Sequence, residues 1–128
     1  MQSLTTQGVE ITVETFFQPD TSNPTQQLFV FAYRITLENH NSFPVQLLRR
    51  HWHIFDSIGV HREVDGDGVI GQQPVLNSGE TFQYVSGCSL DSDMGKMSGH
   101  YDMINLNDQK EFKVEIPAFN LISPMKSN

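Results

Sequence analysis

The sequence predicts an all-β fold, a fibronectin type III-like (immunoglobulin-like) antiparallel β-sandwich of seven to eight strands with no long helix. Apolar and polar residues alternate along most of the chain, which is the periodicity of half-buried strands. Turn residues interrupt the alternation about every 8 to 12 residues, as in two-sheet sandwiches. Apolar residues do not recur at helical spacing over three turns. At 128 residues the chain has the size of one domain, so we expect residues 1–128 to form a single domain.

The first half of the chain contains four predicted strands. Val9, Ile11 and Val13 alternate with polar residues and mark the first of them. A loop with Pro19 and Pro24 precedes a second strand that is rich in aromatic residues. The four strands are expected at residues 9–13, 28–37, 45–55 and 60–64.

The second half begins with a glycine-rich segment, residues 63–80, and continues with three further strands. Alternation returns at 81–85, 97–103 and 112–116. Pro117 ends or bulges the last strand, because proline cannot donate a hydrogen bond to a sheet.

The predicted core combines the apolar faces of these strands with the single tryptophan, Trp52, which we expect on the same buried side as Leu48 and Ile54. The lack of a cysteine pair favours a fibronectin type III-like sandwich over a disulfide-linked immunoglobulin domain. The expected core is Phe29, Phe31, Tyr33, Ile35, Trp52, Phe82, Tyr84, Val114 and Ile116.

Composition limits the classes of function. A net charge of −7 argues against a nucleic-acid binder, which needs Lys and Arg to neutralise phosphates. Cys88 is the single cysteine, so it cannot form an internal disulfide and fits a reducing compartment. The first residues lack the features of a signal peptide, and the longest apolar run, Leu28–Tyr33, is too short to cross a bilayer. We therefore predict a cytoplasmic protein without membrane insertion.

The glycine-rich segment contains GDGVIG, which has the glycine spacing of a dinucleotide-binding loop. Such a loop must open directly into a helix, but Gln72–Leu76 and a turn at 77–79 follow instead. Glycines that shape turns in an all-β domain explain the pattern better. An anion site for nucleotide or pyrophosphate stays open as an alternative, although two aspartates in the segment oppose it. Its candidate residues are Gly66, Gly68, Gly71, Arg49, Arg50 and Arg62, with His61 nearby.

A second candidate site is a pair of histidines, His51 and His53, which lie two residues apart and share one face of a strand. With a carboxylate such as Glu63 or Asp65 brought across by the sheet, they could bind a divalent metal such as cobalt. The alternative is a solvated outer face without a ligand. No catalytic residue and no cofactor are predicted, because the chain has no nucleophile elbow, phosphate loop or calcium loop.

Five segments occur in an order that resembles the ApaG family, also called CorD, over about residues 8–121. They are RRHWHIFDSIG, EVDGDGVIGQQPVL, SGETFQYVSGC, GKMSGHYDM and FKVEIPAFNL. The resemblance implies a fibronectin type III-like sandwich and an association with cobalt and magnesium resistance or efflux, without an established catalytic activity. It also implies a recognition module, since the same domain is attached to F-box proteins in eukaryotes. We therefore expect a non-enzymatic module that binds a protein partner, followed by a flexible tail at 122–128.

Overall fold

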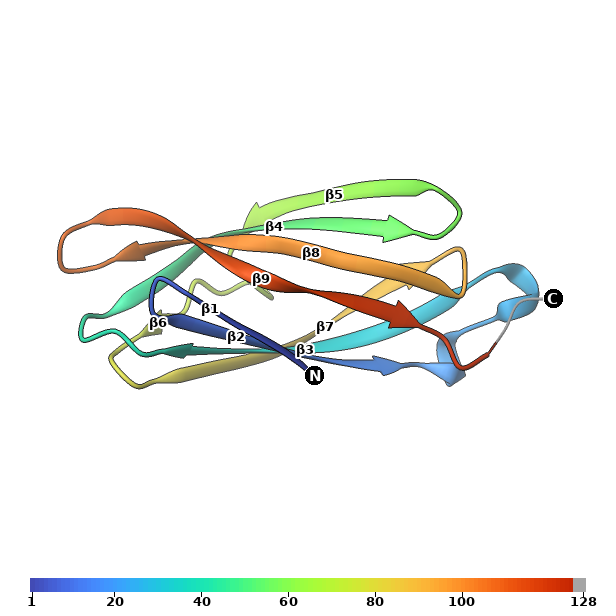
Figure 1. Cartoon of the computed structure of the whole chain (residues 1–128), viewed down its shortest axis with the longest axis horizontal. Helices are drawn as coiled ribbons and strands as arrows, with labels where there is room; N and C mark the ends of the chain where they lie inside the picture. The colour runs from blue at the N-terminus through green and yellow to red at the C-terminus, as the bar shows by residue number, and fades with distance from the viewer. Residues whose placement is uncertain (126–128) are drawn as a thin grey trace.

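The computed structural model describes residues 1–125 as two antiparallel β-sheets packed face to face (Figure 1). One sheet has the order β1-β2-β3-β7, and the other has the order β5-β4-β8-β9, with β6 paired to β4. The predicted antiparallel sandwich is confirmed. The strands are β1 (Gln2–Thr6), β2 (Val9–Phe17), β3 (Phe29–Asn39), β4 (Val45–Asp56), β5 (Val60–Asp67), β6 (Val75–Leu76), β7 (Thr81–Leu90), β8 (Met94–Asn105) and β9 (Lys110–Ile122).

The described residues contain nine strands, two more than the alternation marks. β1 has no buried residue and therefore no apolar pattern, and β6 is two residues long. The helical segments of residues 1–125 are two 3-10 turns of three residues each, Pro19–Thr21 and Pro24–Gln26. No helix in that part of the chain is long and apolar enough to cross a membrane.

The core lies between the two sheets and contains eight of the nine residues predicted for it, among them Trp52, which is 3% exposed. The exception is Phe82, which is half-buried and packs against the edge of the core. The ring of Trp52 meets Tyr33 from the first sheet at a centroid distance of 5.4 Å and Phe119 from β9 at 5.9 Å. These aromatic contacts join the two layers.

A β-bulge in β4 corrects one detail of the predicted core. The pairing of β4 with β8 shifts between Leu47 and Arg49, so Leu48 is the extra residue. Leu47 is fully buried before the bulge, whereas Leu48 is half-buried. The prediction that Leu48 shares the buried side of Trp52 is therefore wrong, because the bulge changes the phase of the alternation.

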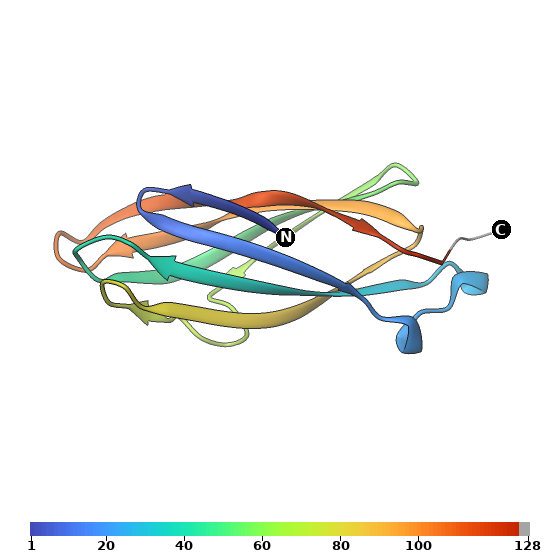
Figure 2. The same cartoon turned by 60° about the horizontal axis from the view of Figure 1, so that its bottom comes forward.

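The two lateral edges of the sandwich differ. On one side β1 runs beside β9 (Figure 2), and the Glu115 N–H donates to the Thr6 hydroxyl at 3.4 Å. On the other side β5 and β7 are edge strands, and within residues 1–125 each pairs with one neighbour, β4 and β3 respectively. Arg62 of β5 spans this side and donates to the Ser89 carbonyl of β7 at 2.7 Å.

The chain end was expected to be a flexible tail from residue 122. Ile122 is the last residue of β9, and the Ser123 N–H donates to the Asp93 carbonyl at 2.9 Å. Residues 126–128 lie outside the described part of the chain.

Candidate functional site

The outer face of β4, β5 and β8 gathers four of the five histidines of the chain. Strand pairing places them in rows across the sheet. His51 lies opposite Asp65 of β5 on one side and His100 of β8 on the other. His53 lies opposite Glu63 of β5. The sheet thus brings both carboxylates considered from the sequence beside the histidine pair.

Three of these side chains, His51, His53 and Glu63, converge on one point. The Nε2 atoms of His51 and His53 are 3.2 Å apart, and the Glu63 Oε1 lies 3.2 Å from the Nε2 of His51 and 3.6 Å from the Nδ1 of His53. One ligand atom from each residue lies within 4.8 Å of the others. This spacing allows the three residues to share one cation.

Asp65 orients the first histidine of this group. Its carboxylate contacts the Nδ1 of His51. Hydrogen bonding to Asp65 raises the pKa of His51 above its ordinary value, against the opposing effect of burial. In the neutral tautomer that donates from Nδ1 to Asp65, the lone pair of His51 is on Nε2, the atom that lies 3.2 Å from both the His53 Nε2 and the Glu63 Oε1.

Two further histidines, His61 and His100, extend the cluster along the same face. The Nε2 of His61 lies 3.0 Å from the Nδ1 of His53, and its ring stacks on Phe55 with centroids 4.5 Å apart. His100 stacks on His51 at 5.2 Å. Sequence reasoning missed their part in this cluster. Knowledge of the register between β4 and its neighbours β5 and β8 would have placed His61 and His100 beside His51 and His53.

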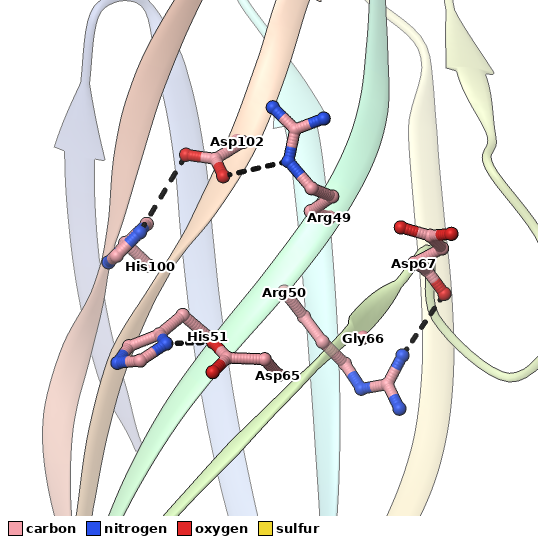
Figure 3. A pocket seen from close by; sticks show the side chains of 8 residues that line it. All are labelled: Arg49, Arg50, His51, Asp65, Gly66, Asp67, His100 and Asp102. Atoms are coloured by element: carbon pink, nitrogen blue, oxygen red, sulfur yellow. Dashed lines mark hydrogen bonds and ion pairs between the residues drawn. The ribbon is translucent and has the colours of Figure 1, made fainter.

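A shallow pocket of about 370 Å³ adjoins the cluster (Figure 3). Arg49 lies at this pocket on the outer face, 3.2 Å from Asp102 and also paired with Glu111. These hydrogen bonds to carboxylates hold the pKa of Arg49 above its usual range. The pocket is lined by Arg49, Arg50, His51, Asp65, Gly66, Asp67, His100 and Asp102.

The three candidate anion-binding arginines have separate partners. Arg50 lies across Gly66 and donates to the carbonyls of Asp67 and Gly68 at 3.1 and 2.9 Å. Arg62 donates to Ser89, on the opposite sheet. Arg49 and Arg50 both line the pocket, whereas Arg62 is not among its lining residues.

The GDGVIG loop is a hairpin turn. Val69 and Gln72 exchange backbone hydrogen bonds of 2.8 and 2.9 Å around Ile70 and Gly71, which both have positive φ. The Gly68 N–H donates to the Leu48 carbonyl at 2.8 Å, and a side chain on Gly68 would clash with the Gln72 carbonyl. The next strand is β6, so no helix opens after the glycines. Three loop amides are therefore already used within the protein.

A second group of potential ligands lies on the other sheet. Glu10, Glu38 and His40 come from β2, β3 and the turn that follows. The His40 Nε2 is 3.3 Å from Glu10 and 3.6 Å from Glu38, and its side chain is 47% exposed against 22% for His51. The group has one imidazole, and sequence reasoning missed it because Glu10 is about 30 residues from Glu38 and His40.

Comparisons with known proteins agree over nearly the whole chain. The ApaG domain model matches residues 19–105. Protein ApaG of Sinorhizobium fredii is 47% identical over 119 residues, which cover 93% of this chain and 91% of that protein. Protein ApaG of Paramagnetospirillum magneticum is 48% identical over 124 residues, 97% of this chain and 95% of that protein. A crystal structure of a Bordetella pertussis protein, solved under the name ApaA, matches with a TM-score of 0.88 and 42% identity over 92% of this chain and 95% of that one.

Proposed function

The chain belongs to the ApaG family, and we propose that it is a non-enzymatic module that recognises a protein partner through the free edge of β5. The observation that carries the proposal is the exposure of this strand. β5 has eight residues, and all of them except Gly66 are exposed. Within residues 1–125 it pairs with β4 alone. An edge strand of this length offers unpaired backbone groups to a strand from another protein.

Side chains on β5 add apolar contact surface to this edge. Val60 is 44% exposed and Val64 is 39% exposed. The same strand carries Glu63 and Asp65, which alternate with Arg62 and Val64, so a partner strand would meet the acidic and the apolar side chains on opposite faces. In strand addition the backbone supplies affinity and the alternate side chains supply specificity.

A non-catalytic role is supported by the state of the single thiol. Burial raises the pKa of Cys88 above its ordinary value, despite the nearby Arg62, which makes the thiol a poorer nucleophile than an ordinary cysteine. A lone thiol also supports a cytoplasmic location as part of this proposal. The family resemblance implies a link to cobalt and magnesium resistance or efflux. We propose that the protein partner acts in this process.

Capture of the partner by an edge variant tests the proposal. The tagged chain is crosslinked in cells, and partners are identified by mass spectrometry for the wild type and for the double variant Val60→Lys/Val64→Lys. Lysines on an edge strand oppose pairing, so we expect a specific partner to be lost. The control is Ile122→Lys on β9, which is 59% exposed in the wild type and should leave capture unchanged. Equal capture by all three proteins would contradict the proposal.

A second candidate function is binding of nucleotide or pyrophosphate, with a divalent metal as bridge, at the GDGVIG loop. The pocket lined by Arg49, Arg50 and Gly66 is the observation that favours it. Both arginines would have to release their present partners for the anion. Calorimetric titration with pyrophosphate and ATP in the presence of Mg²⁺ tests this function. If the site exists, Arg50→Ala weakens binding and reduces its salt dependence, and Gly68→Val abolishes it.

A further inference from the structure

We propose that His51, His53 and Glu63 form a binding site for one divalent transition-metal ion of the zinc class. The site lies on the outer face of β4 and β5. Metal binding there is separate from the proposed recognition of a protein partner and does not depend on it. Each of the three residues offers one ligand atom within 4.8 Å of the others, and we assign the Nε2 of each histidine, which lie 3.2 Å apart, and a carboxylate oxygen of Glu63.

The distances between the ligand atoms match those around a tetrahedral ion. Metal–nitrogen and metal–oxygen bonds of about 2.0–2.1 Å at tetrahedral angles place neighbouring ligand atoms roughly 3.3 Å apart. The Nε2 of His51 lies 3.2 Å from the Nε2 of His53 and 3.2 Å from the Glu63 Oε1. Two of the three separations are therefore already those that an ion requires, and all three ligand atoms lie within 4.8 Å of one another.

Neighbouring groups fix both imidazoles in the orientation that a metal needs. His51 donates from Nδ1 to Asp65, and the Nδ1 of His53 lies 3.0 Å from the Nε2 of His61, to which it can donate. In the neutral tautomer with its proton on Nδ1, each histidine has a free lone pair on Nε2 for a metal ion. A carboxylate on the far nitrogen, as Asp65 is for His51, is a regular feature of metal-bound histidines.

The ligand set selects the class of ion. Two imidazoles and one carboxylate suit zinc and other late first-row divalent ions, whereas magnesium and calcium need shells made of oxygen atoms. Arg49 lies two residues before His51 on the same face of β4, and its charge is already paired with Asp102 and Glu111. Three protein ligands leave a fourth position of a tetrahedral ion for water, and Glu63 is 52% exposed to solvent.

The Glu10, Glu38 and His40 group provides an internal comparison. It has one imidazole, no second histidine and no carboxylate that bonds the far nitrogen of His40 among the contacts of the described residues. Its side chains are also more exposed than His51. We expect it to bind zinc weakly or not at all, and His40→Ala therefore serves as the matched control.

Calorimetric titration of the chelator-treated, tag-free chain with Zn²⁺ tests the site. We expect one ion per chain, no competition from Mg²⁺, and an affinity that falls on the order of 100-fold in His51→Ala and in His53→Ala. Asp65→Asn should weaken binding about 10-fold, as loss of a group that orients a ligand does. His40→Ala should match the wild type.

Imidazole ¹⁵N chemical shifts identify the ligand atoms directly. Zn²⁺ should shift the Nε2 resonances of His51 and His53 and leave those of His40 in place. Circular dichroism establishes that each variant is folded, and Glu63→Gln replaces any histidine variant that is not. Zn²⁺ binding that survives in His51→Ala and His53→Ala, binding lost in His40→Ala, or the absence of a Zn²⁺ complex at millimolar concentration would each overturn the proposal.

Discussion

The two faces of β4 carry different kinds of residue. On the inner face Trp52 and Ile54 are 3% and 7% exposed and belong to the core. On the outer face the side chains of His51 and His53 are 22% and 35% exposed and face the carboxylates of β5. Successive residues of a strand point in opposite directions, so one segment supplies side chains both to the core and to the candidate site. The comparison teaches that stability and ligand binding should respond to separate substitutions along the same strand.

The largest expected effect comes from the inner face. Trp52→Ala removes the buried ring that contacts Tyr33 and Phe119, and it should lower the free energy of unfolding by about 3–5 kcal/mol. Urea denaturation followed by circular dichroism measures the loss. The fraction that stays folded should bind Zn²⁺ as the wild type does. A loss below about 1 kcal/mol would mean that the inner face does not depend on this residue.

Gly99 is the position where one substitution should affect both the stability of the fold and Zn²⁺ binding on the outer face. It lies opposite Trp52, and a side chain there would clash with the carbonyl oxygen of His51, where β8 approaches β4 closely. Gly99→Val should therefore cost about 3 kcal/mol by forcing the strands apart. It should also weaken Zn²⁺ binding, because His51 moves with its backbone. Unchanged Zn²⁺ affinity in the folded variant would show that the site tolerates this movement.

The hydroxyl pair in the core gives a smaller effect with a defined pH dependence. Tyr84 and Tyr101 are hydrogen-bonded at 2.5 Å, and burial raises the pKa of both above the ordinary value. Because the folded state holds these protons more tightly, their contribution is complete below about pH 10 and falls as the pH rises above it.

Two measurements follow from this pair. The free energy of unfolding should be lower at pH 11 than at pH 8, and the difference should shrink in the double variant Tyr84→Phe/Tyr101→Phe. The single variant Tyr101→Phe leaves the buried Tyr84 hydroxyl without its partner and should cost about 1–2 kcal/mol at pH 7. An equal pH dependence in the wild type and the double variant would contradict the assignment.

The smallest effect on stability belongs to the outer face. In metal-free protein His53→Ala should change the free energy of unfolding by less than about 0.5 kcal/mol, because the side chain is partly exposed and its contacts are polar. Excess Zn²⁺ should raise the melting temperature of the wild type and leave that of His53→Ala unchanged, since a ligand stabilises the state that binds it. A large loss of stability without metal would mean that the two faces are not independent.

Alternation predicted most of the strands and the burial of Trp52, because both depend on local patterns of side chains. It also placed His51 and His53 on one face, since they lie two residues apart. The bulge at Leu48 was not predictable, because an extra residue is defined by the partner strand rather than by the strand that carries it.

The residues that make up the candidate site depend on the register between β4 and its neighbours β5 and β8, which the sequence does not define. A slip of one residue in the pairing of β4 and β5 would turn Glu63 and Asp65 to the other face, so the sequence left open which carboxylate meets which histidine. His100 is opposite His51 through a pairing between strands about 50 residues apart, which no local pattern reports. β1 was missed because four of its five residues are polar and four of the five are exposed, so it has no apolar face.

The aromatic cluster in the core has an optical consequence. Trp52 is the single tryptophan of the chain, and Tyr33 lies 5.4 Å away, so light absorbed by tyrosine is passed to one indole and emitted there. That indole lies between the two histidines in sequence and on the other side of the same strand. A paramagnetic ion such as Cu²⁺ bound outside would sit one strand thickness from the emitter and quench it. The tryptophan emission of the unlabelled protein thus reports metal binding on the outer face of β4, although the indole lies on the inner face.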